Sequence, residues 1–298
     1  AGFYFYFSRK IRELRESGHE GTARAYASSL RSMQRYLGKK DFPFIKLSSR
    51  IISDYQGKLL ASGICDNTIG FYLHNIKALF RKGCREMGLE LPCPFRDISI
   101  KTEKTLKRSL DPVVIKTLSA IELEKDSPLS LARDIFMFSF YTRGMSFVDI
   151  ALLKKRHVFP GEICYRRHKT DQLMRVGINK EISRILERYK NVPGEYIFPL
   201  FPAERDPYAG YRNAYHRIRY SLGKISRVIG LEFPLRLHAA RHSWATIAKV
   251  NGASVHVIGE CLGHTSEKTT RIYLKELDHS ALDAVNNQVA DFILAVDD

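Results

Sequence analysis

A basic segment bounded by prolines divides this chain into two parts. It runs CPFRDISIKTEKTLKRSLDP from Cys93 to Pro112 and lacks the spacing of apolar residues that a helix or a strand shows. With 298 residues, 44% of them hydrophobic, the chain exceeds one average domain and can bury real cores. We therefore predict one domain over residues 1–100, a basic linker over 101–110 and a second domain over 111–298.

The part before the linker is predicted to be all helical. Apolar residues at helical spacing indicate two helices over residues 3–38, with Thr22 as the N-cap of the second and Gly38 at its end. Two more helices are expected over 53–62 and 67–87. Together these segments predict a small helical bundle.

The second part is predicted to be mainly helical with a small antiparallel sheet. Asp111 followed by Pro112 is typical of a helix start. Further on, GEICYRRHKTDQLMRVGI alternates apolar and polar residues around a polar centre, which is the pattern of a β-hairpin. A helix over about 208–229 and a short helix over 257–262, closed by Gly263, complete the prediction.

The charge of the chain points to a polyanionic partner. Lysine and arginine outnumber aspartate and glutamate by 48 to 32, which gives a net charge of +16. Nucleic acid is the expected partner of such a protein, because each neutralised phosphate releases condensed counterions. A merely basic protein without such a partner is the alternative.

Cysteine usage and hydropathy narrow the class of protein further. The five cysteines show neither the paired spacing of a zinc site nor the pattern of a disulfide framework, so we expect no metal and no cofactor. No apolar run approaches the ~20 residues that span a bilayer, and the opening residues lack the apolar core of a signal peptide. We expect a cytoplasmic protein with no membrane partner.

Four residues of the last third carry groups that can act together on a phosphate. His238 and Arg241 are three positions apart at the start of a predicted helix, so their side chains share one face. An arginine fork holds two phosphate oxygens, and a histidine can bond a third or move a proton. His264 follows at a helix end, and Tyr273 offers a hydroxyl. Each has a plainer explanation alone: a capping histidine, a solvated arginine, a helix-terminal histidine or a packed tyrosine.

The order and spacing of these residues resemble the tyrosine recombinase or phage integrase family. The resemblance runs from about Ala23 to Leu277 and is densest in LHAARHSWAT and IGECLGHTSEKTTRIYLK. It implies a core-binding helical bundle (SAM-like) and a catalytic domain that form a C-shaped clamp around double-stranded DNA. It assigns the nucleophile to Tyr273, the H-x-x-R pair to His238 and Arg241, the late histidine to His264 and the hairpin lysine to Lys169.

The resemblance also implies a mechanism. Attack by Tyr273 on the scissile phosphate would form a 3′-phosphotyrosyl link and free a 5′-hydroxyl, so that rejoining needs no ATP. Arg241 would neutralise the charge that develops in the transition state, and Lys169 would protonate the departing oxygen. His238 would assist proton removal from the tyrosine, and His264 would bond a non-bridging oxygen. No metal is required.

The first catalytic arginine is where the chain departs from the family pattern. Family members usually read like TGLRISEL, whereas YTRGMSFVDIALLKK places Ser146 in the arginine's slot. Arg143 is the nearest cation, three residues earlier and about one helical turn away. Because a serine donates only one neutral hydrogen bond, we predict that Arg143 supplies the missing charge. The alternative is a defective or differently assembled site.

DNA contacts and assembly are predicted less specifically. Candidate DNA-binding residues are Arg24, Tyr72, Asn75, Lys77, Arg81, Lys82 and Arg212, with Arg217 and Arg219 nearby, although a solvated basic face would look the same. The amphipathic tail over 280–296 resembles a segment that packs against a neighbouring protomer. This implies a homotetramer on DNA and a monomer off DNA. Folding of the tail onto its own core is the alternative.

The predicted function is site-specific DNA recombination by strand exchange, which covers integration, excision and inversion. We expect no arm-binding domain before residue 1, so an invertase and the integrase of a mobile element are both open. The alternative is a catalytically impaired, sequence-specific DNA-binding protein of the same fold, because Ser146 occupies the slot of the first catalytic arginine. A helix-turn-helix regulator would explain the charge but would leave the order of the four residues as coincidence.

Overall fold

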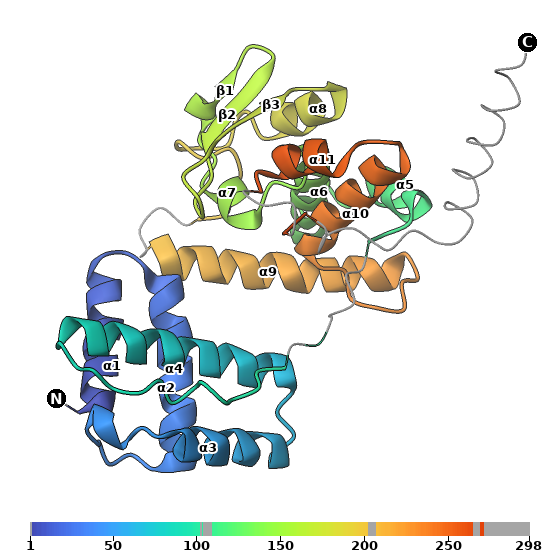
Figure 1. Cartoon of the computed structure of the whole chain (residues 1–298). Coiled ribbons are helices and arrows are strands. Elements are labelled where there is room, and N and C mark those ends of the chain that lie inside the picture. Colours follow the sequence, from blue (N-terminus) through green and yellow to red (C-terminus); the bar gives the residue numbers. More distant parts are fainter. Residues whose placement is uncertain (1, 102, 104–108, 202–206, 265–268, 271–298) are drawn as a thin grey trace, which may run out of the picture. The chain divides into compact units, whose positions relative to one another are not determined.

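The computed structural model describes residues 2–101, 103, 109–201, 207–264 and 269–270. The chain forms two compact units, Ala1–Thr105 and Leu106–Asp298, which are described separately below. Both are mainly helical, and the second contains a three-stranded antiparallel sheet, so the predicted fold class is confirmed (Figure 1). None of the described helices is long and apolar enough to cross a membrane.

The first unit is a helical bundle, as predicted. Its helices are α1 (Phe3–Glu16), α2 (Glu20–Leu37), α3 (Ser49–Ala61) and α4 (Asp66–Glu86), with a short 3-10 helix at Phe44–Lys46. Two predicted starts are wrong. α2 begins before Thr22, because a tight turn through Gly18 (φ 76°) lets the helix start at Glu20. α3 begins four residues before Ser53, because the Ser48 side chain accepts a hydrogen bond from the amide of Ile51.

Aromatic rings fill the centre of the first unit. Phe44 packs edge to face with Phe3 at a centroid distance of 4.9 Å and stacks on Phe80 at 5.8 Å. Gly83 makes room for this ring, since a Cβ there would lie 2.5 Å from Phe44. The aromatic cluster therefore joins α1, α4 and the 3-10 helix in one core.

The second unit is built around the buried helix α6. Its helices are α5 (Pro112–Ala120), α6 (Pro128–Tyr141), α7 (Phe147–Ala151), α8 (Lys180–Arg188), α9 (Pro207–Val228), α10 (Leu237–Val250) and α11 (Val255–Leu262). α6 packs against α9, α10, α8, α5 and α7. The predicted cap at Asp111 is confirmed, because its carboxylate accepts a hydrogen bond from the amide of Val113 at 2.8 Å. The glycine stop of α11 is confirmed as well: Gly263 is left-handed, with φ 62°.

The sheet contains the predicted hairpin. β1 (Val158–Phe159), β2 (Glu162–Arg166) and β3 (Leu173–Gly177) pair in the order β1-β2-β3, all antiparallel. Tyr165 and Met174 are paired and buried, so the apolar positions of the alternating pattern face the core. The register leaves residues 167–172 as the turn between β2 and β3, and this turn carries Lys169.

Candidate active site

Arg241 is a buried cation of the second unit that is held by two backbone carbonyls. It lies in the first turns of α10 and is only 5% exposed. Its Nη1 donates to the carbonyl of Gly144 at 2.8 Å, and its Nη2 donates to the carbonyl of Leu262 at 2.5 Å. The guanidinium therefore joins the loop after α6 to the last turn of α11, where the helix dipole favours a positive charge.

Gly144 allows this close approach. Its φ is 74°, and a Cβ there would lie 2.5 Å from Cγ and 2.8 Å from Cα of Arg241. Arg143 before it also has a positive φ, 58°, so the two residues turn the chain sharply between α6 and α7. This turn brings the backbone onto α10 and places the Arg143 side chain next to β3.

His264 completes a hydrogen-bonded chain with Arg241. Its Nε2 lies 3.0 Å from Nη2 of Arg241, and its Nδ1 lies 3.0 Å from Oγ1 of the buried Thr270. A guanidinium can only donate, so Nε2 accepts and Nδ1 carries the proton. Burial above all, and then the charges of Arg241, Arg167 and Lys169, lower the pKa of His264 to about 4. The ring is neutral at pH 7 in this state.

The other predicted cations lie close to the same place. Lys169 is exposed in the hairpin turn, yet its charge acts on the His264 ring. Arg143 is half-buried, and its Nη1 lies 3.5 Å from the carbonyl of Arg175, a weak hydrogen bond. Burial raises the pKa of Tyr165 on β2, and Arg241 and Arg143 both oppose this shift. The structure thus brings Arg143, Lys169, Arg241 and His264 together near the end of β2.

His238 and Tyr273 are the two remaining predicted catalytic residues. His238 is exposed in the first turn of α10, one turn before Arg241, with its ring edge to face with His242 at 5.1 Å. Tyr273 lies outside the described residues. The roles assigned to these two residues remain predictions.

Ser146 takes part in a different interaction. Its hydroxyl donates to Oδ2 of Asp149 at 2.6 Å, and Oδ1 of the same carboxylate accepts from the amide of His168 at 2.8 Å. Asp149 is 5% exposed, so this is a buried link between the start of α7 and the hairpin turn. The residue in the slot of the family's first arginine therefore supports the turn that carries Lys169.

Sequence reasoning missed four residues of this site. Arg167 reaches Gly263 from the hairpin, and Asp149, Tyr165 and Thr270 surround the cations. The only sequence signal was the cluster RRHK, which offers more than one cation beside Lys169. Among the residues that the structure describes, no three His, Cys, Asp or Glu side chains gather as a metal site would require.

The predicted DNA-binding residues do not share one surface. On α4, Lys77 and Arg81 lie on one flank and Asn75 and Lys82 on the other, because residues four or seven apart share a helix face. Asn75 is also bonded within the unit, since its Nδ2 donates to Oγ of Ser29 at 3.0 Å. Tyr72 is half-buried on α4, and Arg24 is half-buried on α2.

The hairpin, α10 and α11 of a mainly helical chain gather these groups, and two family models identify the class of protein. The model of the phage integrase family matches residues 109–279, and that of the phage integrase SAM-like domain matches residues 2–95. The chain belongs to the phage integrase family. It is a site-specific DNA recombinase that acts by strand exchange, as predicted.

Relatives and solved structures agree with this assignment. Tyrosine recombinase XerC of Shewanella oneidensis is 26% identical over 226 residues, covering 72% of this chain and 70% of that protein. Tyrosine recombinase XerD of Pseudomonas putida is 24% identical over 262 residues, covering 85% and 86%. A lambda integrase (residues 75–356) dimer bound to a COC′ core site is similar in fold, with a TM-score of 0.68, 16% identity and coverage of 94% and 97%. The Tn1549 transposon integrase in complex with right end DNA has a TM-score of 0.69, 14% identity and coverage of 97% and 100%.

Proposed function

We propose that the chain cuts and rejoins double-stranded DNA at a specific site through Tyr273, with a 3′-phosphotyrosyl intermediate. The observation that carries this proposal is the anchored guanidinium of Arg241, held by two backbone carbonyls and bonded to His264. A phosphoryl transfer that proceeds without a metal needs fixed donors where negative charge develops. Arg241 is such a donor, because its position does not depend on the substrate.

Arg143 is proposed as the second guanidinium. Its one bond among the described residues is the weak contact with the Arg175 carbonyl, so the side chain can turn to a phosphate at little cost. Ser146 cannot take this role without giving up its 2.6 Å bond to the buried Asp149. Arg143 is thus the cation of the α6–α7 loop that is available for the substrate.

The remaining groups would move protons. Lys169 would protonate the leaving 5′-oxygen from the hairpin turn, and His238 would take the proton of the Tyr273 hydroxyl. His264 cannot donate from Nε2 while it accepts from Arg241. Burial and the nearby cations lower the pKa of His264; a bound phosphate would offset the cations, so the ring could gain a proton and donate to a non-bridging oxygen.

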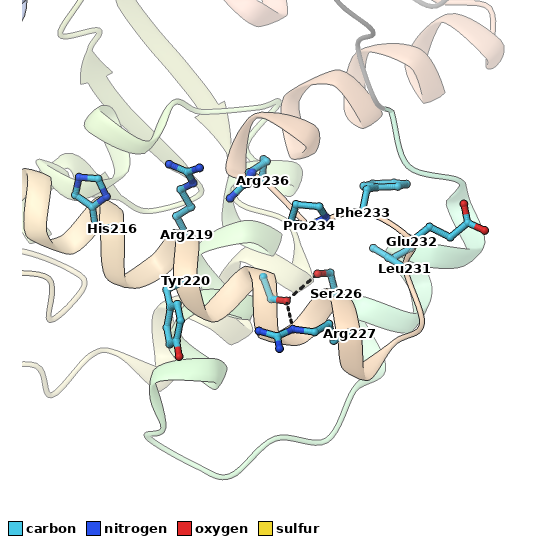
Figure 2. Close-up of a pocket in the computed structure, with 11 residues that line it drawn as sticks. His216, Arg219, Tyr220, Ser226, Arg227, Leu231, Glu232, Phe233, Pro234 and Arg236 are labelled. Carbon is cyan, nitrogen blue, oxygen red and sulfur yellow. Dashed lines mark hydrogen bonds between the residues drawn. The ribbon is translucent and has the colours of Figure 1, made fainter.

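A cationic cavity on the second unit is proposed as a contact for the DNA backbone. It has a volume of about 640 Å³ and lies between α9 and the segment before α10. Figure 2 shows His216 and Arg219 on α9 on the same side as Arg236, two residues before His238. Arg212 precedes His216 by one turn and so continues this face of α9. A row of basic side chains leading to α10 is suited to following a phosphate backbone.

Assembly and location follow from the same proposal. A lambda integrase tetramer bound to a Holliday junction is similar in fold, with a TM-score of 0.66 and 15% identity. We propose that this chain likewise assembles as a tetramer on DNA, through the segment 280–296, which lies outside the described residues. A recombinase that acts on chromosomal or mobile-element DNA would work in the cytoplasm, where that DNA lies.

A nicked duplex tests the function. The DNA site is first found by selecting the genomic segments that the full chain binds most tightly. Each site is then synthesised as a duplex with a nick next to the cleavage position. After cleavage the short fragment diffuses away, so the strand cannot be rejoined and the covalent adduct accumulates. The wild-type chain should form a covalent protein–DNA adduct, and Tyr273→Phe should bind the same DNA without forming it. A wild-type chain that binds but never forms the adduct would refute the enzymatic function and favour a catalytically impaired DNA-binding protein.

A further inference from the structure

Arg167 spans the active site from the hairpin to α11. It directly follows β2, and its half-buried side chain donates from Nη1 to the carbonyl of Gly263 at 2.5 Å, 96 positions along the chain. Among the described residues this is the one hydrogen bond of the guanidinium. The contact therefore joins the element that carries Lys169 to the loop that carries His264.

The α11 side of this contact is rigid. The amide of Gly263 donates to the carbonyl of Glu260 at 2.9 Å. The amide of His264 donates to the carbonyl of Gly259 at 2.8 Å. A Cβ at Gly263 would lie 3.0 Å from Nη1 of Arg167 and 2.9 Å from Sδ of Met174. The hairpin thus packs directly onto the glycine, which leaves little room for the loop to shift.

The hairpin side is rigid as well. The amide of Arg167 donates to the carbonyl of Gln172 at 2.9 Å, and the amide of Asp171 donates back to the carbonyl of Arg167 at 2.8 Å. The amide of His168 is held by Asp149 at 2.8 Å. Lys169 therefore belongs to a turn that is closed by its own backbone and fastened at two points, Asp149 and Gly263.

We propose that Arg167 is a positioning residue that sets Lys169 at a fixed place relative to His264 and Arg241. The inference rests on the proposed role of Lys169 as the general acid. Proton transfer to a leaving oxygen depends steeply on placement, and a misplacement of about 1 Å can cost on the order of 100-fold in rate. Without the Arg167 contact the turn would keep its hairpin shape but lose its hydrogen bond to the α11 loop.

The chemistry of the leaving group separates positioning of the acid from direct action on the phosphate. In cleavage, the Tyr273 oxygen bonds to phosphorus, the bond from phosphorus to the 5′-oxygen breaks, and Lys169 gives that oxygen its proton. When sulfur replaces the bridging 5′-oxygen, the electron pair leaves as a thiolate that needs no proton. A variant that slows cleavage by misplacing Lys169 should therefore cleave the bridging-sulfur substrate at nearly the wild-type rate. A variant that weakens phosphate binding should remain slow on both substrates.

The test measures single-turnover adduct formation on matched nicked duplexes with a bridging oxygen or a bridging sulfur. Arg167→Ala should slow the oxygen substrate by roughly 10- to 100-fold and the sulfur substrate by less than about 3-fold, in parallel with Lys169→Ala. Arg167→Lys, which keeps a donor, should recover part of the loss. Arg175→Ala is the matched control, because it removes an exposed arginine of the same hairpin that pairs with Glu162 and does not reach Gly263.

Equal loss on both substrates, or no loss on either, would overturn the proposal. If Arg167→Ala does not fold, Arg167→Lys must slow the oxygen substrate more than the sulfur substrate, to a smaller degree than expected for Arg167→Ala. An Arg167→Lys chain that slows neither substrate, or both equally, would count against the proposal. Failure of the underlying function looks different, since the wild-type chain would then form no adduct on either substrate.

Discussion

Nη2 of Arg241 lies 3.0 Å from Nε2 of His264, so a cation donates a hydrogen bond to a histidine that must be neutral to accept it. Thr270 fixes the other ring nitrogen at 3.0 Å. His264 is therefore held in a defined tautomer, and in the proposed mechanism the binding of a phosphate would change its protonation.

This relationship predicts a pH dependence of stability. The pKa of His264 is lowered to about 4 from an ordinary value near 6.5. Between about pH 6.5 and pH 4, His264 is therefore protonated in the unfolded chain and neutral in the folded chain. The contribution of His264 to stability should fall between about pH 6.5 and pH 4 and change little below that. Thermal unfolding of the wild-type chain and of His264→Gln over this range should show the steeper decline in the wild type. Parallel curves would contradict the assignment.

We predict that the side chain of Arg143 contributes to the rate of cleavage and that the hydroxyl of Ser146 does not. Arg143→Asn keeps a residue that tolerates a positive φ but removes the charge, and it should slow single-turnover adduct formation on the order of 100-fold. Ser146→Ala should stay within a few-fold of the wild type, because Asp149 still accepts from the His168 amide through its other oxygen. A rate near wild type for Arg143→Asn would remove Arg143 from the catalytic residues.

Gly144→Ala should disrupt the Arg241 anchor. The new Cβ would lie 2.5 Å from Cγ of Arg241, and the positive φ adds strain, so we expect a loss of about 2–4 kcal/mol in the free energy of unfolding. Gly230→Ala is the control, because its φ of 72° is similar but nothing lies within 4 Å of the added Cβ. Chemical denaturation should show a clearly larger loss for Gly144→Ala, and equal losses would mean that backbone strain alone explains the effect.

The proposed DNA face of α9 can be checked by salt dependence. Arg219→Gln should lower the slope of log affinity against log salt by about 1, since one phosphate contact is lost. Arg217→Gln removes the same charge, but Arg217 donates to the carbonyl of Leu200 at 2.9 Å within the unit, so its slope should not change. Fluorescence anisotropy over a salt series measures both. An unchanged slope for Arg219→Gln would exclude it from the DNA contacts.

Local patterns were sufficient for several elements. The alternation in GEICYRRHKTDQLMRVGI predicted the hairpin, and the Asp111 and Gly263 signals predicted a helix start and a helix stop that the structure confirms. These features depend on neighbours in the chain, since alternation and caps are satisfied within a few residues. The starts of α2 and α3 were wrong because a turn at Gly18 and a cap at Ser48 competed with the residues that we favoured.

The amino-acid sequence by itself determined the mainly helical class, the hairpin, the family and the candidate catalytic residues. Each of these can be recognised from the spacing of apolar residues or from the order of motif residues along the chain. Only the tertiary structure revealed the contact of Arg167 with Gly263, the link from Ser146 through Asp149 to His168, and the neutral state of His264. Arg167 and Gly263 lie 96 positions apart, and no local periodicity encodes such a pair. Their contact follows from how the hairpin and α11 pack, and packing also determines the burial and nearby charge that set the pKa of His264.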